Sequence, residues 1–234
     1  MTNKKIGSLV FVCVVLAWTP PAHVDAQTQG QPTVQIPNAG VPEVMTMEGR
    51  FVRAAYNNEG YAILGYQLAN RSLGEEWMLL QFGIALRERV PPYTLTRAAL
   101  SLETPDGKTI ALPTIEEQRQ GNTVALENRA RVTSDSINYF PPNARQACAI
   151  VFFPDPSARA LPREEITVHD QAACAGRLFF KVPGGITYGQ YLLNVKFAKS
   201  LVRVPFRILT AEEEKFLNSN YKDISRQVED AFRQ

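Results

Sequence analysis

From Glu48 onward, short runs of β-branched and aromatic residues alternate with clusters of Gly, Pro, Asn and Asp. Runs that recur at intervals of roughly ten residues are typical of antiparallel strands joined by turns. Chains that alternate strands with helices place longer helical segments between the strands. The sequence therefore predicts a mainly β fold, an antiparallel sandwich over residues 48–209. Its expected strands cover residues 50–56, 61–68, 77–90, 95–102, 108–112, 147–153, 166–169, 177–182, 190–197 and 201–209.

Residues 113–145 interrupt the strand pattern. Residues 116–120 are helix formers, and residues 125–131 are charged with a nearly helical period. The segment closes on Tyr139, Phe140 and two prolines. We therefore expect a helical insertion with one or two short turns of helix. Two roles stay open for it: a recognition loop on a rigid β scaffold, or a plug whose aromatic side chains cover the core.

The last segment, residues 210–234, has the pattern of an amphipathic helix. Thr210 and Glu213 have the spacing of a capping box at its start. The apolar side chains that recur at steps of four and three are Leu217, Tyr221, Ile224 and Val228. This stripe has two possible uses, because it can cover the sandwich of its own chain or enter the groove of a partner protein.

The N-terminus has the three parts of a secretory signal. Lys4 and Lys5 precede an uncharged apolar run over residues 6–18, and prolines follow it. The run is shorter than the roughly 20 residues that a membrane-spanning helix needs. The sequence predicts a signal peptide over residues 1–26, export to the periplasm or the medium, and no transmembrane segment in the mature chain.

The mature chain would begin with a flexible leader. Residues 27–47 are rich in Gln, Pro, Gly and Thr and have no sustained hydrophobic period. Removal of the signal peptide takes away Lys4, Lys5 and Asp25, so the formal net charge falls from +2 to +1. Nucleic-acid binding usually requires a clustered basic face, and we therefore expect no nucleic-acid partner.

Cys148 and Cys174 remain after processing. An even pair of cysteines in an exported protein indicates a disulfide. Closing a loop of this length stabilises a fold by about 3.5 kcal/mol in the chain-entropy model. Two buried free thiols are the alternative.

The sequence offers little reactive chemistry. The mature chain has a single histidine, His169, which leaves small scope for a metal site or a catalytic triad. Asp170 follows His169 directly. Because neighbouring residues on a strand face opposite sides, the two side chains are poorly placed to orient one another. The chain has two acidic doublets in polar segments, Glu116 with Glu117 and Glu164 with Glu165. The carboxylates of such doublets usually face solvent. We therefore predict no catalytic residue, no cofactor and no metal.

Two segments resemble the immunoglobulin-like modules of exported bacterial proteins. One is residues 102–112 (LETPDGKTIAL), which combine a strand, a tight turn and a strand. The other is residues 186–197 (ITYGQYLLNVKF), where Gly189 precedes alternating apolar residues. The resemblance implies an immunoglobulin-like sandwich and assigns no site residue.

These features favour an exported, non-enzymatic binding or structural module that contacts another envelope or extracellular protein. The alternative is a secreted hydrolase, in which two carboxylates from separated strands would converge on one bond.

Overall fold

The computed structural model describes residues 44–121, 123–154 and 161–232, and there the protein is mainly β. The strands are β1 (Val44–Gly49), β2 (Val52–Tyr56), β3 (Gly60–Gly65), β4 (Trp77–Leu86), β5 (Tyr93–Thr96), β6 (Leu100–Glu103), β7 (Thr109–Ala111), β8 (Gln146–Ile150), β9 (Glu165–Val168), β10 (Ala172–Lys181), β11 (Gly189–Lys196) and β12 (Leu201–Ile208). The helices are α1 (Gln67–Asn70), η1 (Arg97–Ala99), α2 (Ile115–Gln120), α3 (Val124–Val132) and α4 (Ala211–Phe232). The predicted signal peptide and residues 27–43 of the predicted leader lie outside the described residues.

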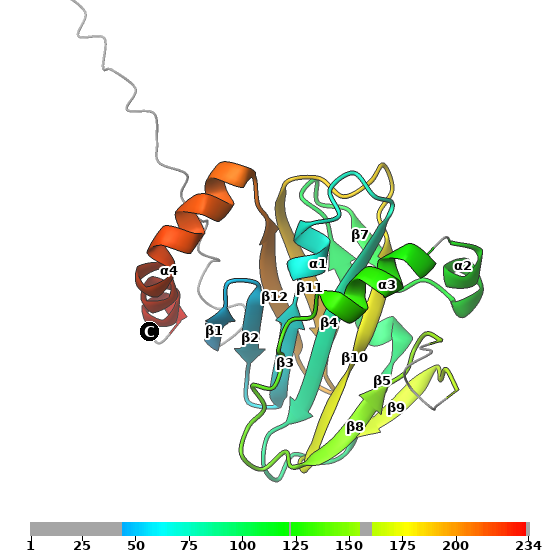
Figure 1. Cartoon of the computed structure of the whole chain (residues 1–234). Coiled ribbons are helices and arrows are strands. Elements are labelled where there is room, and N and C mark those ends of the chain that lie inside the picture. The colour runs from blue at the N-terminus through cyan, green and yellow to red at the C-terminus, as the bar shows by residue number, and fades with distance from the viewer. Residues whose placement is uncertain (1–43, 122, 155–160, 233–234) are drawn as a thin grey trace, which may run out of the picture. The chain divides into compact units, whose positions relative to one another are not determined.

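The strands form two larger sheets and one small sheet (Figure 1). The first has six strands in the order β1-β2-β3-β4-β10-β8, and the second has four in the order β12-β11-β6-β7. Strands β5 and β9 form a two-stranded sheet. All pairs are antiparallel except β8 with β10. The predicted fold class, mainly β and antiparallel with a C-terminal helix, is confirmed.

The order of strands sets a limit on the immunoglobulin resemblance. In immunoglobulin domains the third strand already lies in the opposite sheet. Here β1 to β4 follow one another as neighbours in a single sheet. The resemblance therefore covers the layered antiparallel sheets and not their connections.

The main core lies between the two larger sheets. The ring of Phe206 on β12 lies 5.1 Å from that of Tyr66, which follows β3, and 5.5 Å from that of Tyr191 on β11. Phe82 and Leu193 belong to the same core cluster and have no solvent exposure. Aromatic side chains remove large apolar areas from water, so this cluster contributes strongly to stability.

The β fold begins earlier than the sequence indicated. Residues 44–47, predicted to belong to the flexible leader, are part of β1, which pairs with β2. Met45 and Met47 are buried, whereas Thr46 between them is half-buried. This is the period of two expected of a strand, but methionine is not β-branched and the run therefore did not stand out.

One predicted strand, residues 95–102, is broken into β5 and β6 by η1. The chain changes here from the small sheet to the four-stranded sheet. The change is fixed by Arg97, whose buried side chain binds distant backbone groups, described below. Such tertiary contacts override local strand preference.

The insertion contains α2 and α3, and its final part covers the outer face of the six-stranded sheet. Ile137 and Phe140 pack against a second apolar cluster formed by Val52, Ala54 and Ile63. A Cβ atom added at position 83, which is glycine, would lie only 2.8 Å from the Phe140 ring. The aromatic side chain thus fills a notch in the sheet, as expected for a plug.

Candidate functional site

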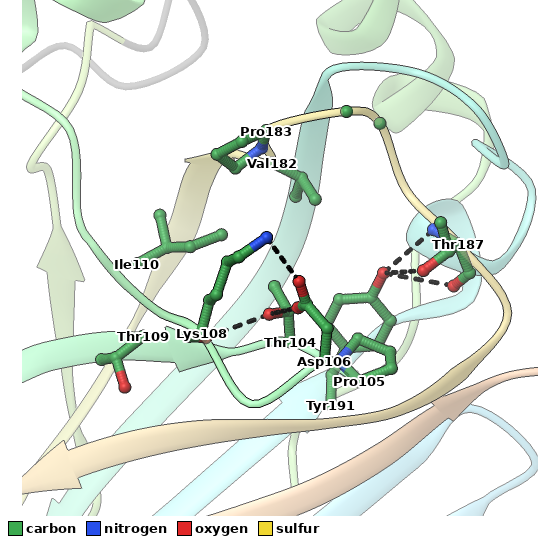
Figure 2. Close-up of a pocket in the computed structure, with 12 residues that line it drawn as sticks. Thr104, Pro105, Asp106, Lys108, Thr109, Ile110, Val182, Pro183, Thr187 and Tyr191 are labelled. Carbon is green, nitrogen blue, oxygen red and sulfur yellow. Dashed lines mark hydrogen bonds and ion pairs between the residues drawn. The ribbon is translucent and has the colours of Figure 1, made fainter.

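Two connections meet at one end of the two larger sheets and enclose a cleft of about 540 Å³ (Figure 2). One is the β6–β7 turn, with Pro105 and Asp106, and the other is the β10–β11 loop, with Pro183. Val182 and Ile110 add apolar surface to the walls. We call this hollow the loop-end cleft. Its volume lies in the usual range of ligand pockets, about 300–1,000 Å³.

The β6–β7 turn is held by its own polar groups. The N–H of Gly107 donates to the Thr104 carbonyl (2.9 Å), and Gly107 has a φ of +80° that favours glycine. The Lys108 ammonium lies 2.7 Å from the Asp106 carboxylate. Hydrogen bonds from Lys108 and then Thr104 lower the pKa of Asp106 to about 2. The rim of the cleft therefore carries a pair that stays ionised at neutral pH.

The β10–β11 loop is fixed by glycines and by one tyrosine. Gly185 has a φ of +89°, and a Cβ there would lie 2.7 Å from the Gly74 carbonyl oxygen. The Tyr191 hydroxyl accepts a hydrogen bond from the Thr187 N–H (3.0 Å) and donates to the Thr187 carbonyl (3.1 Å). A tyrosine bound to the backbone a few residues upstream also occurs in immunoglobulin-like sandwiches, as the tyrosine corner. Both walls of the cleft are thus preformed.

This arrangement is suited to binding. Apolar walls can take an apolar side chain, while the ionised pair and the threonine hydroxyls at the rim can orient polar groups around it. Among the described residues that line the cleft, Asp106 is the one carboxylate. Because its pKa is about 2, it holds no proton to donate near pH 7.

The two cysteines meet as the sequence predicts. Cys148 on β8 is paired in register with Cys174 on β10, and a disulfide bond joins their Sγ atoms. The bond joins the edge strand of the six-stranded sheet to its neighbour.

The predicted partner-binding stripe lies inside the protein's own core. Leu217, Ile224 and Val228 are buried, at 1%, 6% and 2% exposure. The Tyr221 hydroxyl donates to the Met47 carbonyl on β1 (2.8 Å). The first of the two alternatives therefore describes α4, because the stripe covers its own sheet and is not open to a partner. Of the helices in the described ranges, none is long and apolar enough to cross a membrane.

The acidic doublets and the residues around His169 serve local structure. Glu117 accepts a hydrogen bond from the Thr114 N–H (2.7 Å) in the capping box of α2. The Asp170 carboxylate accepts one from the Arg89 N–H (3.1 Å). Glu116 and Glu165 are exposed. The structure does not bring the two doublets into the loop-end cleft.

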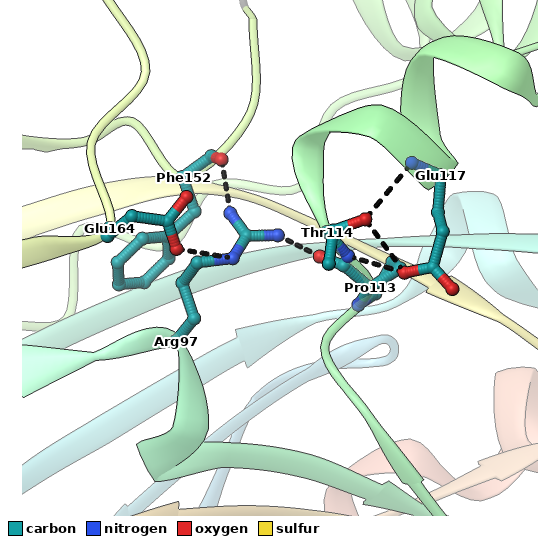
Figure 3. Close-up of polar contacts among 6 residues, drawn as sticks. All are labelled: Arg97, Pro113, Thr114, Glu117, Phe152 and Glu164. Atoms are coloured by element: carbon teal, nitrogen blue, oxygen red, sulfur yellow. Dashed lines mark hydrogen bonds and ion pairs between the residues drawn. The ribbon is translucent and has the colours of Figure 1, made fainter.

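A buried arginine was missed by sequence reasoning (Figure 3). The Arg97 guanidinium donates to the carbonyls of Phe152 and Pro113 and lies 3.3 Å from the Glu164 carboxylate. It also lies 4.5 Å from the centre of the Phe153 ring. Burial lowers the pKa of Arg97, and Glu164 opposes this. The only sequence signal was a single cation inside the apolar run 95–102.

No group of three or more His, Cys, Asp or Glu side chains able to hold a metal occurs in the described part of the chain. No protein-family model, curated protein or solved structure matches this chain.

Proposed function

We propose that this chain is an exported, non-enzymatic module that binds a segment of another envelope or extracellular protein in the loop-end cleft. The observation that carries the proposal is a preformed apolar hollow between two rigid loops, with an ionised pair at its rim. Binding sites are often built from loops that a rigid β scaffold holds in place.

The chemistry of the cleft favours a polypeptide ligand with an apolar anchor. Pro105 and Pro183 present flat, rigid surfaces on the two sides. An apolar side chain placed between them would lose its hydration without ordering flexible groups of the protein, which reduces the cost of binding. Asp106 and Lys108 can exchange hydrogen bonds with the backbone on either side of that anchor.

A photo-crosslinking experiment in the expressing cells tests this proposal. A photoreactive amino acid at Thr109, an exposed residue of the cleft rim, is expected to trap a protein partner. The change Ile110→Asp in the same protein should abolish the adduct, because it places a charge on the apolar wall. Val132, 86% exposed and not in the cleft lining, is the control position. Equal adducts from positions 109 and 132, or no effect of Ile110→Asp, would refute the proposal.

A further inference from the structure

The two larger sheets end in four edge strands: β1 and β8, and β12 and β7. An edge strand presents unpaired N–H and C=O groups that another strand can join. Proteins protect such edges with a covering helix, with proline or charged side chains, or by keeping the strand short.

Three of these edges carry such protection. β1 lies against α4, whose Tyr221 hydroxyl donates to the Met47 carbonyl. β12 contains Pro205, which lacks an N–H, and the charged Arg203 and Arg207. β7 has only 3 residues.

β8 carries none of these features in the residues that the structure describes. Its sequence, Gln146–Ile150 (QACAI), contains no charged residue and no proline, and its pairing with β10 has no bulge. Ala147 and Ala149 are exposed. The disulfide at Cys148 fastens the strand to β10, so the edge is held in place for a partner.

The direction of the backbone groups along β8 can be deduced from one contact. The Gln146 N–H donates to the carbonyl of Gln171 (2.8 Å), the residue directly before β10, and therefore faces that strand. Since backbone groups alternate between the two edges of a strand, the N–H and C=O groups of Ala147 and Ala149 face away from β10. The open stretch ends at Val151, whose carbonyl accepts from the Arg163 N–H (2.7 Å).

We propose that β8 pairs antiparallel with β8 of a second copy of this chain, about a two-fold axis at Cys148. In this register Ala147 of one copy lies opposite Ala149 of the other. Residues so paired exchange both of their backbone hydrogen bonds, so each outward group of both alanines gains a partner. The six-stranded sheets of the two copies become one continuous sheet.

The composition of β8 favours a second copy over a different protein. In a two-fold interface the same residues face one another, so a charge near the axis would be brought close to an identical charge. β8 has no charge to repel. Its exposed methyl groups also allow two backbones to approach without displacing large side chains.

Sedimentation velocity of the full mature chain, from about 10 µM to 1 mM, tests the pairing, since weak association falls in this range. We expect a reversible dimer. Ala149→Pro removes two outward N–H donors per dimer and should raise the dissociation constant roughly tenfold or more. Ala149→Ser keeps the N–H and is the control. A thermal melt of each variant checks that it is folded.

Paired charges test the register independently of proline. The double variant Ala147→Lys with Ala149→Lys opposes like charges across the axis and should weaken the dimer, whereas Ala147→Glu with Ala149→Lys opposes unlike charges and should restore it. A monomer at every concentration, a dimer unaffected by Ala149→Pro, or equal behaviour of the two double variants would overturn the proposal. None of these outcomes bears on the loop-end cleft.

Discussion

The two edges of the six-stranded sheet are closed in different ways. At β1 the helix α4 packs its apolar stripe on the sheet, and its Tyr221 hydroxyl binds the Met47 carbonyl. At β8 the disulfide between Cys148 and Cys174 secures the strand, and no strand in the described ranges pairs with its outer side. Both devices hold an edge strand to the sheet, but only the first also prevents another strand from joining.

This difference separates stability from accessibility. A helix that covers an edge buries apolar surface and blocks pairing at the same time. A disulfide constrains the chain without covering its backbone groups. In the six-stranded sheet, the edge that is held by a covalent bond is therefore the one that we propose for assembly.

Removing α4 should have the largest effect. Truncation after Leu209 takes away Leu217, Ile224, Val228 and Phe232, each at most 6% exposed. Burial of such side chains contributes about 1.5–3 kcal/mol each, and their sum is comparable to the whole stability of a domain, about 5–15 kcal/mol. We expect no cooperative thermal transition by circular dichroism. A truncated protein that melts like the full chain would show that α4 is not part of the core.

Removing the disulfide should have the next largest effect and should act on the other edge. The double variant Cys148→Ser with Cys174→Ser is expected to lose about 3.5 kcal/mol, as chain entropy predicts for this loop. Urea denaturation measures the loss. Amide hydrogen exchange should accelerate in β8 but not in β1. Equal acceleration of exchange in β8 and in β1 would contradict the claim that the disulfide and α4 each secure a different edge.

Arg97 binds the Phe152 carbonyl, two residues beyond the end of β8. Arg97→Met should cost about 2–3 kcal/mol, since it leaves buried carbonyls without donors. Arg129→Met is a matched control, because Arg129 is paired with Glu75 at a more exposed site. Urea denaturation of both variants measures the difference. A loss no greater for Arg97→Met than for Arg129→Met would contradict the anchoring role.

Replacing Asp135 should have the smallest effect on stability. Asp135 lies on the final part of the insertion, which crosses the six-stranded sheet between its two edges. Burial raises the pKa of Asp135 above 3.8, against the hydrogen bond from the Gln67 N–H (2.8 Å). The native state thus binds a proton more strongly than the unfolded state, and the contribution to stability falls as pH rises from 3.8 through the raised value. Asp135→Asn keeps an acceptor for Gln67.

The melting temperature of Asp135→Asn should therefore exceed that of the natural protein at pH 7, and the difference should shrink toward pH 3. Thermal melts across this range measure it. A difference in melting temperature that is independent of pH would show that ionisation of the Asp135 carboxyl is not its cause.

Local patterns explain which parts of the fold could be predicted from the sequence. Strands β2, β4, β11 and β12 combine β-branched or aromatic residues with clear turn formers, and each begins and ends within a few residues of the predicted range. The capping box of Thr210 and Glu213 is confirmed by its reciprocal hydrogen bonds (2.9 and 3.2 Å). These features depend on near neighbours in the chain.

The features of the fold and of the site that the sequence did not predict depend on contacts between distant segments. Pro105 and Pro183 form the loop-end cleft only because β6 and β10 end at the same place. The break between β5 and β6 at Arg97 depends on hydrogen bonds from its side chain to the carbonyls of Pro113 and Phe152. The parallel pairing of β8 with β10 was hinted at only by the cysteines. The hydrophobic period of a segment carries no information about which distant segments it contacts.

Amide hydrogen exchange of the monomer at low concentration tests the difference between the two edges most directly. The N–H groups of Ala147 and Ala149 should exchange at least about a hundredfold faster than those of Gln146 and Cys148, because only the latter face β10. Raising the concentration should protect the two alanines as β8 pairs with a second copy. Slow exchange of Ala147 and Ala149 in the monomer would show that the edge is already closed and would contradict this account.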